Sequence, residues 1–153
     1  MNRFFDWLVT SPWSQAMAAA EWVFPIVQSL HFAGFALLIG TIVMVDLRLL
    51  GIGLRGQNPA ELADDLKRWT GAGLGLILVT GFVMFSGSAN AYHYNPAFRF
   101  KMTCLMLALL FHFTLHRRAL REETSAPVAK LAGATSLLLW SAVVAGGRMI
   151  AFV

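Results

Sequence analysis

The sequence predicts an all-α polytopic membrane protein, a bundle of four transmembrane helices with an N-terminal interfacial segment. Of its 153 residues, 58% are hydrophobic and 13% are charged, whereas a water-soluble domain carries about a quarter charged residues. Four apolar stretches each approach the roughly 20 residues that cross a hydrocarbon core. We place the spans at about 22–47, 69–88, 97–116 and 130–150, in one transmembrane domain covering residues 1–153.

Local signals mark where these helices begin. The first apolar run extends from Trp22 to Val45 without a charge. Asn58-Pro59-Ala60-Glu61 predicts that the second helix begins in water, because a capping residue, a proline and an acid follow in the preferred order. Asn95-Pro96 repeats this start for the third helix, and the fourth is expected after Pro127, ending near Val153. The interfacial segment is predicted from its apolar residues, which are Phe4, Phe5, Trp7 and Leu8.

Basic residues predict the orientation in the membrane, because cytoplasmic loops retain positive charge. They are concentrated in two loops, after the first and the third helix; these residues are Arg48, Arg55, Lys67, Arg68, Arg117, Arg118, Arg121 and Lys130. Four crossings then put both termini on the periplasmic side of a bacterial inner membrane. The net charge of +4 is accounted for by this topology, so a nucleic-acid partner is not expected and the lipid bilayer is.

His31 is the leading candidate for a functional residue, since an ionisable group inside a membrane span is costly. At about 1.5 Å per residue it lies roughly 13 Å below the outer boundary. Gly34, one turn away, would leave room for a flat ligand, and imidazole is a common axial ligand of haem iron. The alternative is an interhelical hydrogen-bond network of His31 with Gln28, Ser29 and Thr41.

His112 and His116 are four residues apart in the third helix, so they share a face and could bind a metal or offer a haem ligand. For His116, the position beside Arg117 and Arg118 favours an interfacial cation over a ligand. His112 lies roughly 22 Å down, about 9 Å deeper than His31, which disfavours one haem bridging the two. Met106 lies level with His31 and is the candidate second axial ligand, with a five-coordinate iron or pairing across an oligomer axis as alternatives.

Charged residues at the span edges are interpreted as pairs or as anion contacts. Asp46 and Arg48 do not face each other on a helix, so their partners are expected on other helices. The cations available at that end are Arg68, Arg117 and Arg118. Lys101 and Arg148 could contact a haem propionate or a lipid phosphate. The spans hold no Ser/His/acid set and no carboxylate pair, so no catalytic residue is proposed.

Small residues predict close helix contacts and an oligomer. Gly71, Gly73 and Gly75 lie in the second span, and Gly71 and Gly75 have the spacing of a small-xxx-small motif. Four short helices enclose little interior, so part of this glycine surface should stay uncovered within one chain. We therefore expect a homo-oligomer, a dimer or a trimer.

Several segments resemble a family of small bacterial membrane proteins described only as a domain of unknown function. They are Glu21-Trp22-Val23-Phe24-Pro25, His31-Phe32-Ala33-Gly34, Asp46-Leu47-Arg48-Leu49-Leu50-Gly51, Asn95-Pro96-Ala97-Phe98-Arg99-Phe100-Lys101 and Gly147-Arg148-Met149-Ile150-Ala151. The resemblance covers nearly the whole chain and implies a four-helix fold. Its matching positions are His31, Asp46, Arg48, Lys101, His116 and Arg148, whereas His112 departs from the pattern. Copper-resistance membrane proteins and cytochrome b type bundles are similar only by distant analogy.

These observations favour an integral membrane b-type haem protein that serves electron transfer or haem-based sensing, with His31 as axial ligand and a quinone or another redox partner. One alternative is a non-redox membrane interaction or accessory protein, in which the polar residues only fix helix packing. The other is handling of copper or another metal through His31, Met84, Met106 and His112.

Overall fold

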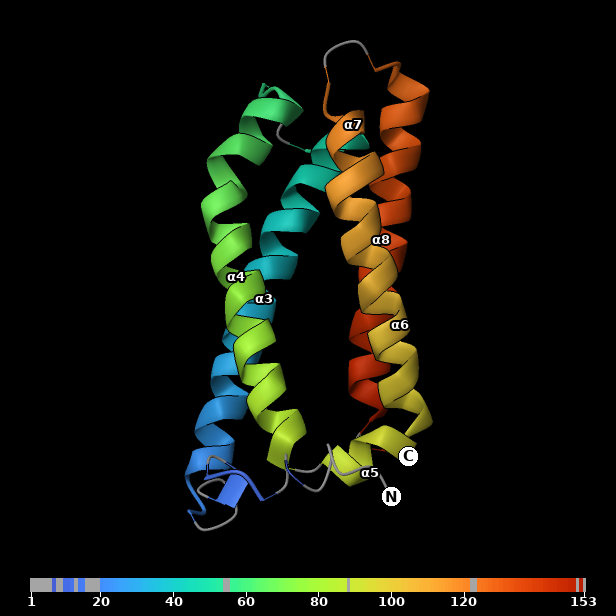
Figure 1. The fold of residues 1–153 in the computed structure, drawn as a ribbon. Coiled ribbons are helices and arrows are strands. Elements are labelled where there is room, and N and C mark those ends of the chain that lie inside the picture. Colours follow the sequence, from blue (N-terminus) through green and yellow to red (C-terminus); the bar gives the residue numbers. More distant parts are fainter. Residues whose placement is uncertain are drawn as a thin grey trace. The chain divides into compact units, whose positions relative to one another are not determined.

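Helices are the regular secondary structure of the part that the computed structural model describes, which is residues 7, 10–12, 14–15, 20–53, 56–87, 89–121, 124–150 and 152. No strand occurs among these residues, so the all-α prediction is confirmed. The helices in Figure 1 are α3 (Val23–Leu49), α4 (Pro59–Gly87), α5 (Ala89–Tyr94), α6 (Pro96–Phe111), α7 (Arg117–Ala119) and α8 (Ala126–Met149), and a π-helix, η1 (His112–His116), joins α6 to α7.

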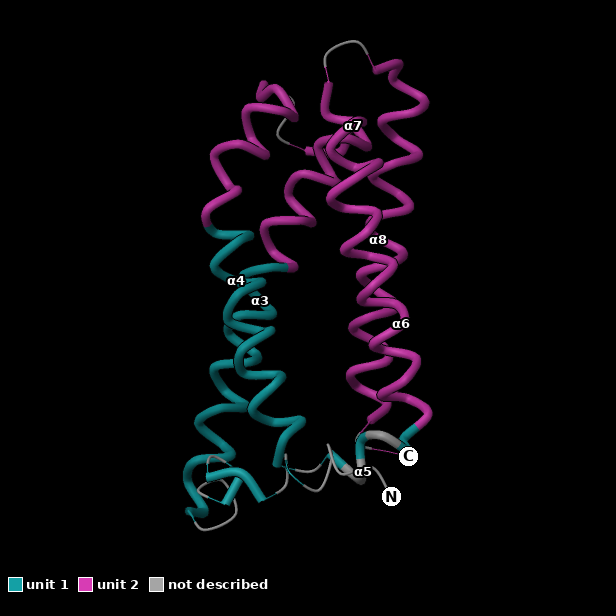
Figure 2. Tube along the Cα trace, in the orientation of Figure 1, with its two compact units in different colours: residues 1–38, 69–95 teal, residues 39–68, 96–153 magenta. Residues whose placement is uncertain are grey.

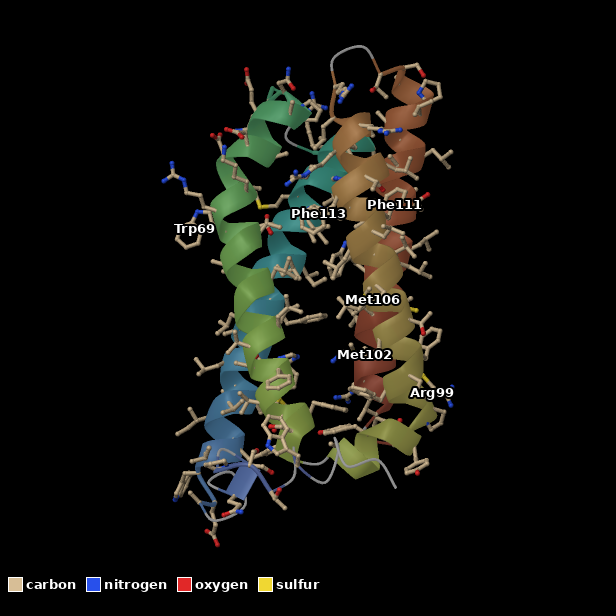
Figure 3. The ribbon with its side chains drawn as sticks, in the orientation of Figure 1. Trp69, Arg99, Met102, Met106, Phe111 and Phe113 are labelled. Atoms are coloured by element: carbon tan, nitrogen blue, oxygen red, sulfur yellow. The ribbon has the colours of Figure 1, made fainter. Side chains whose placement is uncertain are left out.

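Four helical stretches of the described chain are long and apolar enough to cross a membrane. They are Val23–Leu49, Pro59–Gly87, Pro96–Ala119 and Ala126–Met149. Many of their large apolar side chains are exposed; Trp69, for example, projects from α4 (Figure 3) and is 59% exposed. Such exposure suits hydrocarbon surroundings, where apolar surface needs no cover. The chain is therefore of the multi-pass membrane type that its sequence predicts.

The predicted helix starts agree with the structure. α4 begins at Pro59, and the Asn58 side-chain Oδ1 accepts a hydrogen bond from the Ala60 amide at 2.9 Å, as an N-capping residue does. α6 begins at Pro96. α8 begins at Ala126 and ends at Met149. Val153, near which the end of the fourth helix was expected, lies outside the described residues.

The predicted interfacial segment falls mostly outside the described residues, which include neither Phe4, Phe5 nor Leu8. Two of its later residues contact protein. Ser11 and Ser14 are buried, and the Ser14 hydroxyl donates a hydrogen bond to the Ser86 carbonyl at 3.3 Å. This bond joins the segment to the end of α4.

The chain divides into two compact units, drawn in different colours in Figure 2. Unit 1 comprises Met1–Leu38 and Trp69–Asn95, and so contains the first part of α3 and the last part of α4. Its two helices touch at glycines. A Cβ built on Gly73 would lie 2.8 Å from the Leu38 amide nitrogen and 2.9 Å from the Gly34 carbonyl oxygen. Gly73 is therefore the residue that lets the backbones approach.

Unit 2 comprises Ile39–Arg68 and Pro96–Val153. Inside it, glycines of α8 make two close contacts. A Cβ on Gly133 would lie 2.9 Å from the Asp46 carbonyl oxygen of α3, and one on Gly146 would lie 3.1 Å from Cα of Lys101 on α6. These contacts hold α8 against both α3 and α6, and they bring Asp46 beside the helices that carry the other polar groups of this unit.

Candidate functional site

His31 is half-buried on α3 and forms a hydrogen bond across to α4. Its Nδ1 lies 2.9 Å from the Thr80 hydroxyl oxygen. That hydroxyl donates its one proton to the Leu76 carbonyl, at 2.6 Å. The Thr80 oxygen can therefore only accept from His31, which fixes the proton of the neutral imidazole on Nδ1 and leaves the lone pair on Nε2.

Thr80 is a residue that the sequence argument missed. The predicted network named Gln28, Ser29 and Thr41, all on the helix of His31 itself. Thr80 follows His31 by 49 positions, and only the pairing of α3 with α4 brings the two together. A threonine in the middle of an apolar span was the available signal, because a buried hydroxyl normally finds a partner.

The two glycines beside His31 have different surroundings. A Cβ on Gly34 would meet the Leu76 side chain at 3.0 Å and the Ile77 side chain at 3.1 Å, so this side of α3 is packed against α4. A flat ligand resting on Gly34 would have to displace both side chains. A Cβ on Gly81 would lie 3.3 Å from Cε1 of His31, so Gly81 makes room for the imidazole itself.

Asp46 and His116 form a buried pair in unit 2. Nε2 of His116 lies 2.6 Å from Oδ1 of Asp46, and the two side chains are 2% and 0% exposed. The expectation that Asp46 pairs with another helix is correct, although Arg68, Arg117 and Arg118 were the partners considered. His116 is also not the interfacial cation that its place before Arg117 favoured, because it is enclosed by protein.

Two further polar side chains surround this pair. The His112 ring stacks on the His116 ring, with centroids 5.2 Å apart and planes 23° apart. Ser136 of α8 is fully buried and faces Asp46 without a hydrogen bond of full geometry. The two imidazole rings are nearly parallel, so the in-plane lone pairs of their nitrogens do not converge on one metal ion. The described residues also contain no group of three His, Cys, Asp or Glu that could hold a metal. We therefore do not assign His112 and His116 as ligands of one ion.

The π-helix η1 carries both histidines. It interrupts the third span between α6 and α7. The hydroxyl of Thr114, in η1, donates a hydrogen bond to the Leu110 carbonyl of α6. A side-chain bond of this kind competes with the regular backbone ladder. π-helical turns are rare and frequently occur at functional sites, so η1 draws attention to the same place as the buried pair.

The other residues that the sequence suggested as haem ligands or haem contacts lie elsewhere in unit 2. Lys101 of α6 lies along α8, where a Cβ on Gly147 would be 3.7 Å from its ammonium nitrogen. The Arg148 guanidinium stands 5.7 Å from the centre of the Phe152 ring. Met106, labelled in Figure 3, is 65% exposed on α6.

The backbone of His93 belongs to the short helix α5. In the same helix, Tyr92 stacks on Phe85 with ring centroids 6.4 Å apart. Burial raises the pKa of the Tyr92 phenol above its ordinary value. This aromatic pair therefore packs α5 against the end of α4.

Comparison with known proteins gives a family and no function. A family model described as "Family of unknown function (DUF6644)" matches residues 4–153. No curated protein and no solved structure matches the chain. The match covers nearly the whole chain, as the resemblance of its segments suggested.

Proposed function

Since the chain belongs to DUF6644, a family of unknown function, its activity has to be argued from its own residues, and we propose that it is a membrane b-type haem protein. His31 is the axial ligand to the iron. The haem serves electron transfer or haem-based sensing, with a quinone or another redox protein as the exchanging partner.

The observation that carries this proposal is the hydrogen-bond sequence from His31 through Thr80 to the Leu76 carbonyl. Histidines that ligate a metal almost always donate their other ring N–H to a fixed acceptor, which sets the tautomer and the ring orientation. The Thr80 oxygen provides such an acceptor, and the lone pair on Nε2 has the electronic form that binds iron.

Absorption spectroscopy of the purified protein, produced with a supply of haem, tests the proposal. The wild type is expected to show a Soret band that changes on reduction. His31→Ala should abolish or strongly shift this band. Thr80→Val keeps the shape of the side chain and removes the acceptor, so haem affinity should fall by roughly 10- to 100-fold, as for other outer partners of metal ligands.

Ser29→Ala is the matched control, because Ser29 is exposed on the same helix and its hydroxyl bonds only back to the Pro25 carbonyl within α3. Its spectrum should equal that of the wild type. A wild-type protein that carries no haem, or a His31→Ala variant with normal haem content, would defeat the proposal. The first result would favour a non-redox interaction protein, unless elemental analysis of the sample finds copper or another metal.

We further propose that the chain resides in a bacterial inner membrane with both termini in the periplasm, and that it associates as a dimer or a trimer. The first part rests on the Lys and Arg residues near the ends of the helices. The second is supported by Gly71 and Gly75 of α4, where an added Cβ would meet nothing within 4 Å. Small residues left open on a transmembrane helix suit contact with another helix.

A further inference from the structure

A cluster of polar side chains is enclosed in unit 2, away from the residues that carry the haem proposal. Asp46 of α3 and Ser136 of α8 are 0% exposed, and His116 of η1 is 2% exposed. His112 stacks on His116. Ionisable groups inside a transmembrane segment are costly, and they commonly mark ion or proton pathways.

Four hydrogen-bonding atoms of the cluster lack a hydrogen bond of full geometry. Within the described residues, Oδ2 of Asp46, Nδ1 of His116, Nδ1 of His112 and Oγ of Ser136 are buried without a hydrogen bond. Each such atom costs free energy in a folded protein. A pair selected only to hold two helices together would be expected to satisfy its second oxygen and second nitrogen as well.

The charge of the pair depends on one proton. Nε2 of His116 and Oδ1 of Asp46, 2.6 Å apart, share a hydrogen between them. If Nδ1 of His116 carries no proton, the pair holds one net negative charge inside the membrane. If Nδ1 is protonated, the pair is an imidazolium and a carboxylate, with no net charge. A low dielectric makes the difference between these two states large.

We propose that Asp46 and His116 form a proton-binding site within the membrane. The proton binds to Nδ1 of His116 through the lone pair of that nitrogen, and no other bond forms or breaks. The Nε2 hydrogen bond to Asp46 persists in both states. The proton comes from water and returns to it, and His112 stacks on His116 with its own Nδ1 unpartnered.

Arg117 of α7 and Arg48 of α3 do not neutralise Asp46. Arg117 follows His116 directly, but its guanidinium lies over the Phe113 ring, 5.1 Å from the centroid. Arg48 is on the helix of Asp46, and its Nε donates to the Gln57 carbonyl in the following loop. Both side chains are thereby directed to other partners, so His116 is the residue that balances the charge of Asp46.

The charged residues of α8 and α6 also have other surroundings. Lys130 lies at the start of α8, with its Cε 4.0 Å from a Cβ built on Gly51. Arg148 is at the other end of α8, over Phe152. On α6, Lys101 runs along Gly147, and Arg99 is exposed. The protonation of His116 therefore decides the net charge of this enclosed group.

Nuclear magnetic resonance of the full chain in lipid nanodiscs, with the histidine side chains labelled with ¹⁵N, tests the proposal. The protein has four histidines, so single substitutions assign each signal. As the pH is lowered across the range in which the protein keeps its helical content, Nδ1 of His116 should change from an unprotonated to a protonated resonance. Nε2 should remain protonated throughout.

Two variants separate a proton site from a structural bond. Asp46→Asn should change the pH at which Nδ1 of His116 titrates and remove the persistent protonation of Nε2. Ser29→Ala, on the same helix but in unit 1, should leave the His116 titration unchanged. An Nδ1 of His116 that stays in one protonation state over this range, in wild-type protein that keeps its helical content, would overturn the proposal. That measurement needs no haem, so the two proposals can fail separately.

Discussion

The close contact at Gly73 gives a direct test of how α3 and α4 pack in unit 1. In Gly73→Ala, the new Cβ would lie 2.8 Å from the Leu38 nitrogen, 2.9 Å from the Gly34 oxygen and 3.1 Å from the Leu38 Cα. All three are backbone atoms of α3. Because a backbone cannot turn aside as a flexible side chain does, the helices themselves must move apart.

Two effects set the size of the change in stability. Alanine is favoured over glycine in a helix by about 1 kcal/mol. Overpacking a tight contact costs about 1–3 kcal/mol. Gly40→Ala is the matched control, since Gly40 is on α3 and an added Cβ there meets nothing within 4 Å. The helix-propensity gain is common to both variants, so Gly73→Ala should be less stable than Gly40→Ala by about 1–3 kcal/mol.

Reversible unfolding in mixed micelles with a rising fraction of SDS, followed by far-ultraviolet circular dichroism, measures this difference. Both variants should have the helical content of the wild type before unfolding begins. If Gly73→Ala unfolds at the same SDS fraction as Gly40→Ala, then α3 and α4 are not in backbone contact at this glycine, and the packing argument fails.

Two further predictions concern the proposed topology and assembly. Reporter fusions after Gly56 and after Glu123 should score cytoplasmic and fusions at either terminus periplasmic, because Lys and Arg accumulate in those two loops; a cytoplasmic C-terminus would contradict this. Gly75→Leu should release monomers that keep their helical content, because the added side chain separates helices at the open face of α4. Native mass spectrometry in mild detergent measures the release, and a wild type that is monomeric in every detergent that preserves folding would refute it.

The helices could be predicted because their signals are local. Composition alone identifies apolar runs long enough to cross a membrane, and Asn58 and Pro96 stand next to the helix ends that they mark. The π-helix η1 was not predicted, since one widened turn leaves no period in the sequence.

The polar contacts between helices were harder to predict because they depend on which residues lie level. Asp46 and His116 are 70 positions apart in the chain. The sequence indicated that Asp46 has a partner on another helix, and formal charge directed attention to the arginines. Those arginines are exposed, whereas His116, directly before Arg117, meets the carboxylate inside the protein. A single sequence does not show, to better than a helical turn, how deep each residue lies along its membrane span.

The two histidine contacts differ in what they leave unsatisfied, and this difference bears on function. At His31 the hydrogen bond to Thr80 continues to the Leu76 carbonyl, so Nδ1 and the hydroxyl both have partners and one tautomer is fixed. At His116, Nδ1 and the second oxygen of Asp46 lack partners. A fixed tautomer suits a ligand that must hold one orientation, and an open nitrogen beside a buried carboxylate suits a group that gains and loses a proton. The same residue type is thus suited to different chemistry in the two units, because its neighbours differ.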